Sequence, residues 1–218
     1  MDFSLDWKDL DWIRAQWKRK LVVKGVVHPD DAARIVDAGA DAVGFVFAGG
    51  PRAVTPAEAR RITRKLPAFV HRVGVFIDAP ADHVRLIARA VGLSWAQLHG
   101  GESRAYAAGL GLPFVKVFRV ADGKVVAAAR RFRSSLVHLD THVPGIAGGT
   151  GATFDWGIAR RVGRFARVIL AGGLTPENVA DAVAAAAPFA VDVSSGVESR
   201  PGRKDRRRLR RFIEEAHR

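Results

Sequence analysis

One unit recurs along the chain, and this repeat limits the fold more than any other feature. Each copy has a short apolar, β-rich run, then Gly, Pro or Asp, then an Ala-rich amphipathic segment. We expect strands at residues 21–24, 42–47, 71–76, 95–98, 114–118, 136–140, 168–171 and 190–194. Strands that alternate with helices pair in parallel through right-handed crossovers. Eight such units favour a closed sheet over an open one, so the sequence predicts an α/β fold, a single-domain (βα)8 TIM barrel over residues 21–218.

Prolines mark the expected starts of several helices. Proline suits the first turn of a helix, because the N–H that it lacks would have no partner there. The clearest predicted starts are Pro29, Pro56, Pro80 and Pro176. Acidic residues follow each of them, where the helix dipole favours negative charge.

Residues 1–20 precede the repeat, and we expect them to form an N-terminal extension. Leu10, Ile13 and Trp17 lie at helical spacing, and three basic residues close the segment. The pattern favours a short helix packed over the base of the barrel or another surface patch. A helix that docks a partner is the alternative.

The composition bears on several classes of function. Without cysteine the chain forms no disulfide, thiolate metal site or thiol nucleophile. No apolar run reaches the roughly 20 residues that cross a bilayer, and the N-terminal residues do not resemble a secretory signal, so we expect a cytoplasmic protein with no membrane partner. The net charge of +13 lies on expected helix faces without interleaved aromatic residues, so we expect no nucleic-acid partner. A positive field would still attract an anionic substrate.

Glycine-rich loops after the last three strands give the strongest functional signal. Glycine lets backbone N–H groups approach an anion, and loops after strands seven and eight commonly hold phosphate in such barrels. Any one loop could be a tight turn without a ligand, but three together predict a phosphate site. The expected phosphate-binding residues are Gly148, Gly149, Gly172, Gly173, Ser194, Ser195 and Gly196.

Several motifs occur in a fixed order along the chain. They include QLHG at 97–100, GGTG at 148–151 followed by FDW at 154–156, LAGGL at 170–174, and DVSSGVE at 192–198. This combination resembles the phosphoribosylanthranilate isomerase family of tryptophan biosynthesis. The resemblance runs from about Leu21 to the C-terminus and leaves out only the first 20 residues.

The resemblance implies an Amadori rearrangement, which converts an N-(5-phosphoribosyl) arylamine into a 1-amino-1-deoxyribulose 5-phosphate. A general acid protonates the ribose ring oxygen and opens the sugar to an imine. A general base then removes the C2′ proton, and the resulting enolamine becomes the ketone. The expected partner is a phosphorylated sugar or aminosugar, with no metal and no organic cofactor, and a homodimer is compatible with the sequence.

The resemblance also implies roles for individual residues. Asp140 falls at the position of the acid, Arg52 at that of the residue holding the anthranilate carboxylate, and His99 and Asp192 line the substrate site. Each has a plainer alternative when taken alone. Asp140 could cap the next segment, Arg52 could be a surface residue, and His99 could be structural.

The first strand departs from the family pattern. The family ends this strand with Lys-Ile-Cys-Gly and uses the cysteine as base, whereas this chain reads VVKG at 22–25, which puts Lys24 at the cysteine position. Lys24 could be the base of the same or a closely similar isomerisation. It could instead form a Schiff base in a lyase, aldolase or cyclising enzyme, or grip an anion in a non-catalytic binder. Because Asp140, Arg52 and the glycine loops are retained, we expect an enzyme, and the isomerase is the leading hypothesis.

Overall fold

The computed structural model describes residues 7–17, 21–26, 40–50, 52–141, 153–200 and 203–217. These residues fall into two compact parts, one from Trp7 to Val115 and the other from Lys116 onward. The predicted helix start at Pro29 and the glycines Gly148 and Gly149 lie outside the described residues.

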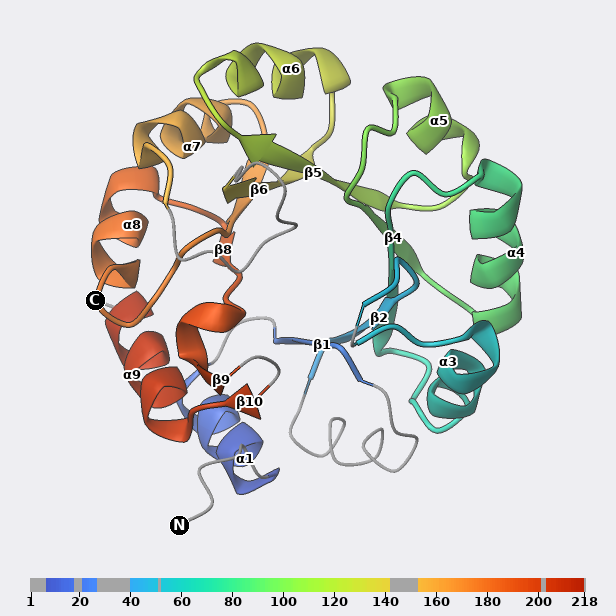
Figure 1. The fold of residues 1–218 in the computed structure, drawn as a ribbon, viewed down its shortest axis with the longest axis horizontal. Helices are drawn as coiled ribbons and strands as arrows, with labels where there is room; N and C mark the ends of the chain where they lie inside the picture. Colours follow the sequence, from blue (N-terminus) through green and yellow to red (C-terminus); the bar gives the residue numbers. More distant parts are fainter. Residues whose placement is uncertain are drawn as a thin grey trace. The chain divides into compact units, whose positions relative to one another are not determined.

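The first part contains parallel strands that pair in chain order, β1 with β2, β2 with β3 and β3 with β4. Helices α3, α4 and α5 follow β2, β3 and β4 and lie outside them (Figure 1). Fully buried Val43 and Phe45 on β2 and Ile62 on α3 belong to its core. The elements are α1 (Trp7–Gln16), β1 (Val22–Lys24), β2 (Ala42–Val46), α3 (Pro56–Thr63), β3 (His71–Phe76), α4 (Ala81–Val91), β4 (Trp95–Leu98) and α5 (Arg104–Gly109).

Helix α1 is attached to the N-terminal ends of β1 and β2. Its Ile13 side chain is buried, and the Arg14 guanidinium lies 3.8 Å from the Asp41 carboxylate. Asp41 directly precedes β2, and its side chain also accepts a hydrogen bond of 2.9 Å from the Leu21 backbone N–H. The aspartate therefore links the helix, the residue before β1 and the start of β2. The boundary and the role of the N-terminal extension stay predictions.

The second part repeats the same pattern. Strand β5 pairs with β6, β6 with β7 and β7 with β8, all in parallel. Buried side chains on β6 and β7, among them Leu139 and Leu170, cluster with Ile158 and Val162 of α7. The elements are β5 (Phe114–Val120), α6 (Lys124–Phe132), β6 (Leu136–Thr141), α7 (Trp156–Gly163), β7 (Arg167–Leu170), α8 (Val179–Ala186), β8 (Ala190–Val191), η1 (Ser195–Val197), β9 (Glu198–Arg200), β10 (Arg203–Lys204) and α9 (Arg206–Ala216).

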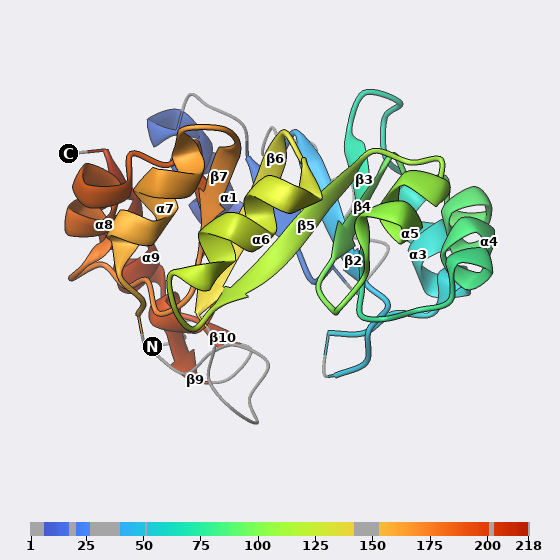
Figure 2. The same cartoon turned by 90° about the horizontal axis from the view of Figure 1, so that it is seen from above.

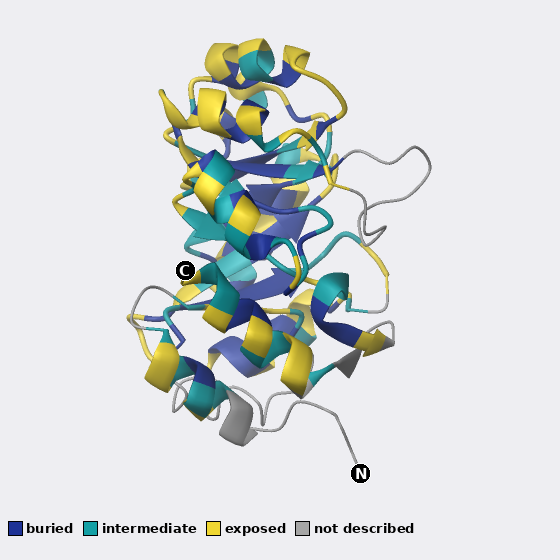
Figure 3. Cartoon of the chain, turned by 90° about the vertical axis from the view of Figure 1, so that its left-hand side faces the viewer, coloured by how far each residue is buried: buried dark blue, intermediate teal, exposed yellow. Residues whose placement is uncertain are grey.

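The figures show how burial follows these elements in the second part. Helices α6 and α7 run beside β5, β6 and β7 (Figure 2). The strands are mostly buried, whereas the helices show alternating buried and exposed positions (Figure 3). Such alternation is expected where one stripe of a helix packs on a sheet and the opposite stripe meets water.

The predicted fold class is confirmed. The described residues contain eight parallel strands in the order β1 to β8, with helices between them, which is the strand order of a (βα)8 barrel. The expected strands at 71–76 and 95–98 match β3 and β4 at both ends. The prediction for the last strand, 190–194, was too long. Strand β8 ends at Val191, because the residues after it turn into the short helix η1.

Two of the predicted helix starts were misplaced. Helix α3 does begin at Pro56, but α4 begins at Ala81, with Pro80 in an extended conformation at its N-cap. Helix α8 begins only at Val179, although Pro176 was the expected start. The physical reason is Asn178, whose side chain accepts a hydrogen bond from the Thr175 backbone N–H and completes a separate turn before the helix.

Nowhere in the described ranges is a helix both long enough and apolar enough to cross a membrane. The cytoplasmic location stays a prediction.

Candidate functional site

Lys24 is the last residue of β1, and its side chain is exposed. It pairs in register with Gly44 of β2, and a Cβ atom added to Gly44 would lie 2.8 Å from the Lys24 Cγ. The lysine stem therefore runs across the face of Gly44, where any larger residue would displace it. Glycine at position 44 thus leaves room for the lysine stem.

Arg52 lies beside the residue that follows Lys24. A Cβ atom on Gly25 would lie 3.0 Å from the Arg52 Cδ, so the arginine stem packs on Gly25. The loop that carries Arg52 folds back onto β2, because the Ala53 N–H donates to the Gly50 carbonyl and the Val54 N–H donates to the Val46 carbonyl. The structure therefore brings two of the predicted site residues, Lys24 and Arg52, to the C-terminal ends of β1 and β2. Two cations placed this way suit an anionic group such as a carboxylate.

His99 directly follows β4 and is half-buried. Its backbone N–H donates to the Phe76 carbonyl at the end of β3, which places it at the same strand ends. The loops around it are joined by two carboxylates. Asp78 accepts a 2.6 Å hydrogen bond from the Gly101 N–H, and Glu102 accepts from the backbone N–H groups of Asp78 and Gly100, at 3.0 and 2.9 Å.

The prediction from sequence did not include Asp78 and Glu102. Asp78 has a φ of +47°, and a Cβ on Gly100 would collide with its carboxylate. Tyr106 adds to this arrangement by donating a hydrogen bond of 2.6 Å to the Ala79 carbonyl. Burial raises the pKa of the Tyr106 hydroxyl, and the nearby Glu102 carboxylate raises it further. The only sequence signal was the glycine pair before an acid, at 100–102.

Asp140 and Asp192 lie at the ends of β6 and β8 in the second part. Asp140 is the penultimate residue of β6, and its carboxylate accepts a 2.9 Å hydrogen bond from the Thr141 N–H. Asp192 follows β8, with its backbone N–H bound to the Leu170 carbonyl at 2.8 Å. The Asp192 carboxylate lies 3.5 Å from Nε2 of His138, a buried residue that the sequence prediction also left out.

Gly172 and Gly173 form the turn after β7, both with positive φ, at +84° and +65°. A Cβ on Gly172 would collide with the backbone nitrogen and the hydroxyl of Thr141, so only glycine fits there. The Asn178 amide holds the turn from the other side, since it donates to the Gly173 carbonyl at 3.0 Å and accepts from the Thr175 N–H at 2.8 Å. This turn therefore has one backbone geometry, fixed on both flanks.

The loop after β8 packs against this turn. Ser195 and Gly196 belong to η1, and Ser194 lies at its N-cap with an unusual ψ of −87°. A Cβ on Gly196 would collide with the carbonyl oxygen of Leu174. The structure thus brings the second and third predicted glycine loops into direct contact, while the first lies outside the described residues. Two adjoining turns rich in glycine and serine can offer several N–H and O–H donors to a phosphate.

The described residues contain no group of three or more side chains that could hold a metal ion. These residues instead offer side chains for acid–base catalysis and for binding anions. The first part has an amine and a guanidinium at its strand ends, and the second has two carboxylates beside glycine turns.

Comparison with known proteins gives consistent results. The family model described as "N-(5'phosphoribosyl)anthranilate (PRA) isomerase" matches residues 21–215. An N-(5'-phosphoribosyl)anthranilate isomerase from Geobacter sp. (strain M21) is 48% identical over 198 residues, covering 90% of this chain and 97% of that protein. The matched region begins where the predicted repeat begins.

Solved structures agree with this. The phosphoribosylanthranilate isomerase of Thermotoga maritima has a TM-score of 0.77 and 39% identity, over 91% of this chain and 98% of its own. A structure of the isomerase in complex with reduced 1-(o-carboxyphenylamino)-1-deoxyribulose 5-phosphate has a TM-score of 0.73 and 37% identity over the same shares. A third describes monomers of the dimeric enzyme from Thermotoga maritima, with a TM-score of 0.72 and 37% identity, again over 91% and 98%.

Proposed function

The chain belongs to the N-(5′-phosphoribosyl)anthranilate isomerase family of tryptophan biosynthesis, and we propose that it performs the Amadori rearrangement with Asp140 as general acid and Lys24 as general base. The substrate is an N-(5-phosphoribosyl) arylamine, in line with the phosphosugar analogue that a relative is described as binding. The arrangement of Lys24 carries this proposal. Its stem lies over Gly44, next to the arginine that is proposed to bind the anthranilate carboxylate.

At this position Lys24 puts an amine where the family pattern has a thiolate, and a general base there takes up the C2′ proton. Lys24 lies exposed at the end of β1, and the stem of Arg52 packs on the adjacent Gly25. Arg52 is proposed to hold the substrate carboxylate beside this amine.

Asp140 and the glycine turns supply the remaining groups. An acid at Asp140 donates its proton to the ribose ring oxygen, which becomes a hydroxyl group when the ring opens. Asp192 and His99 bind the sugar and the aromatic portion, and the donors of the turns at 172–173 and 194–196 hold the phosphate. Gly148 and Gly149 are proposed to complete the phosphate site.

Two substitutions of Lys24 separate its proposed roles. Lys24→Met removes the amine, whereas Lys24→Arg keeps a cation that cannot act as a base. We expect both to lower kcat for phosphoribosylanthranilate by about 10²–10⁴-fold, the usual contribution of a general base. Lys124→Met, on an exposed side chain 3.8 Å from Asp122, is the matched control and should keep the parent rate. Full activity of Lys24→Arg would show that Lys24 acts only as a cation that binds an anionic group and not as a base.

Borohydride tests the Schiff-base alternative on the same samples. If Lys24 is a base, reduction in the presence of the substrate leaves the intact mass of the protein unchanged. A mass increase in the parent that is absent from Lys24→Met would instead show that Lys24 forms a Schiff base with the substrate.

The acid is tested by Asp140→Asn, which keeps the shape and cannot deliver a proton. We expect kcat to fall by about 10²–10⁴-fold with little change in KM. A parent-like kcat would leave Asp140 only with the hydrogen bond that its carboxylate accepts from the Thr141 N–H.

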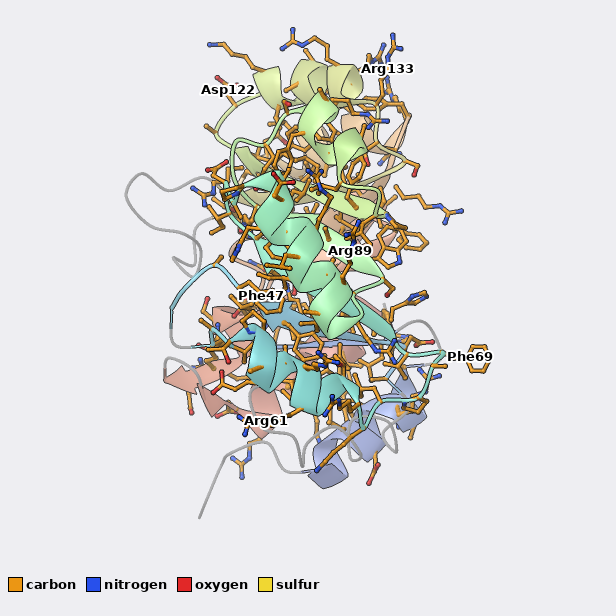
Figure 4. The ribbon with its side chains drawn as sticks, turned by 90° about the vertical axis from the view of Figure 1, so that its right-hand side faces the viewer. Phe47, Arg61, Phe69, Arg89, Asp122 and Arg133 are labelled. Atoms are coloured by element: carbon orange, nitrogen blue, oxygen red, sulfur yellow. The ribbon has the colours of Figure 1, made fainter. Side chains whose placement is uncertain are left out.

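We also propose that the chain forms a homodimer, as one relative is described to do. Phe69 supports this, because its side chain is 96% exposed and points away from the loop before β3 (Figure 4). Burying such a ring between two copies would be favourable. Sedimentation would contradict the proposal if it found only a species of 23.6 kDa.

A further inference from the structure

His138 is a buried titratable group that the proposed reaction does not use. It lies in β6, and its side chain is only 4% exposed. Its register partners are Val117 on β5 and Ile169 on β7, both apolar. A histidine enclosed in this way needs a polar partner to offset the loss of water.

Asp192 is one such partner. The His138 Nε2 lies 3.5 Å from the nearer Asp192 carboxylate oxygen, and the Asp192 side chain is 26% exposed. This distance is long for a hydrogen bond but short for an ion pair in a poorly solvated place. The attraction is therefore strong when the imidazole is protonated and weak when it is neutral.

The sheet places this pair among the proposed substrate-binding groups. Side chains alternate along a strand, so His138 and Asp140 project from the same face of β6. The backbone of Asp192 is fixed by its hydrogen bond to the Leu170 carbonyl, and its carboxylate lies beside the His138 imidazole. His138 is a buried neighbour that can fix the orientation of this carboxylate.

We propose that His138 is a positioning residue, which holds the Asp192 carboxylate in the orientation that binds the sugar. This inference rests on the proposed function, since it assumes that Asp192 contacts the substrate. His138 itself does not contact the reacting atoms. It acts only through Asp192, and its loss therefore weakens substrate binding more than it slows the chemical step.

Other charged groups occupy neighbouring register positions in the described residues of this part. Asp140 lies two residues after His138, and Arg119 of β5 pairs with Asp140. Arg167 lies at the start of β7, opposite Leu136.

The first arm of the test needs no substrate. The His138 imidazole is titrated by NMR in the parent protein and in Asp192→Asn, with His138→Gln used to assign the signal. A nearby carboxylate favours the imidazolium, so the midpoint should be lower in Asp192→Asn. Equal midpoints would show that the two side chains are not coupled and would overturn the proposal, whatever reaction the protein catalyses.

The second arm is a double-mutant cycle in steady-state kinetics. We expect His138→Leu to raise KM by about three- to tenfold, with kcat within about twofold, in line with the loss of one charge-assisted contact. In the Asp192→Asn background the same change should have no further effect on KM. His138→Gln, which keeps a hydrogen-bonding group, should recover part of the loss.

Controls separate positioning from stability. Leu139→Ala alters the adjacent residue on the helix-facing side of β6 and should lower Tm without changing KM. A fall in kcat at constant KM, or an equal KM rise in both backgrounds, would overturn the role of His138. If the parent shows no isomerase activity, the proposed function fails, and with it the assumed substrate contact, while the NMR arm still decides whether His138 and Asp192 are coupled.

Discussion

The two parts of the molecule build their candidate sites in different ways. At the ends of β1 and β2 the chemistry lies on long side chains, Lys24 and Arg52, and the neighbouring glycines only leave room for their stems. At the ends of β7 and β8 the backbone itself forms the site. Gly172 and Gly173 need positive φ, and Gly196 lies against the Leu174 carbonyl.

This difference explains where the chain can depart from its family. An exposed side chain at the end of a strand, such as Lys24, can be exchanged without disturbing the core. A glycine whose Cβ would overlap with backbone atoms cannot be exchanged without moving a second loop. The departure that we infer from the family resemblance falls on the first strand, where the candidate site consists of side chains.

The largest expected effect comes from adding one methyl group to the turn after β7. Gly172→Ala forces an L-residue to a φ of +84° and pushes its Cβ into Thr141. Backbone strain and overpacking together should lower the free energy of unfolding by about 2–4 kcal/mol. Denaturant unfolding measures this change, and phosphate-dependent protection against heat should be lost as well.

Gly163→Ala is the matched control in the same part of the molecule. Gly163 is the last residue of α7, and nothing lies within 4 Å of a Cβ placed there. Alanine also has the higher helix propensity, so stability should stay the same or rise slightly. Equal destabilisation by both variants would break the contrast between a site made of backbone and one made of side chains.

A smaller effect is expected from Asn178→Ala, which keeps the glycines and removes their support. The variant loses two hydrogen bonds from a side chain to the backbone, those with Gly173 and Thr175. We expect a loss of about 1–2 kcal/mol in unfolding free energy and a higher KM from a loosened turn. Asn178→Asp keeps the oxygen that accepts from the Thr175 N–H. Its unfolding free energy should therefore lie between those of the parent and Asn178→Ala. An unchanged KM in Asn178→Ala would mean that the turn holds its shape alone.

The fold was more predictable from the sequence than the site was. Strands such as 71–76 and 95–98 were found at both ends because apolar residues mark them locally. Asp78 and Glu102 were not predicted, because they accept hydrogen bonds from backbone N–H groups in loops. The Gly101 N–H that binds Asp78 and the Asp78 N–H that binds Glu102 each lie more than 20 residues from their acceptor in the sequence. Helix α8 was placed too early because the turn made by Asn178 has the same proline signal as a helix start.

The same limit applies to His138. A histidine within an apolar strand carries no local sign of its partner, and Asp192 directly follows a strand two positions further along the sheet. Lys24 was predicted as a site residue because a family pattern supplied the expectation of a cysteine there, and its role stays a prediction. Contacts between residues distant in sequence needed the structure.

The smallest expected effect concerns two carboxylates, one at a helix start in the first part and one in a turn of the second part. At the start of α3 the Glu58 carboxylate accepts hydrogen bonds from the backbone N–H and the hydroxyl of Thr55, both at 2.8 Å. These hydrogen bonds lower the pKa of Glu58 below its ordinary value of 4.5. The hydroxyl of Thr175 likewise lowers the pKa of Glu177, whose carboxylate lies 3.0 Å from Arg211.

A carboxylate whose pKa is lower in the folded state stabilises the fold above its unfolded pKa, and that stability disappears as the pH falls through the folded pKa. Glu58→Gln should therefore have a slightly lower Tm than the parent at neutral pH, and the two melting curves should converge in strong acid. Salt should change this difference little, because hydrogen bonds from Thr55 are its main cause. Glu177→Gln should show a difference that shrinks with salt, because an exposed ion pair with Arg211 contributes to it. A Glu58 difference that persists unchanged to the lowest pH would show that the amide disturbs the helix start for a reason other than lost charge.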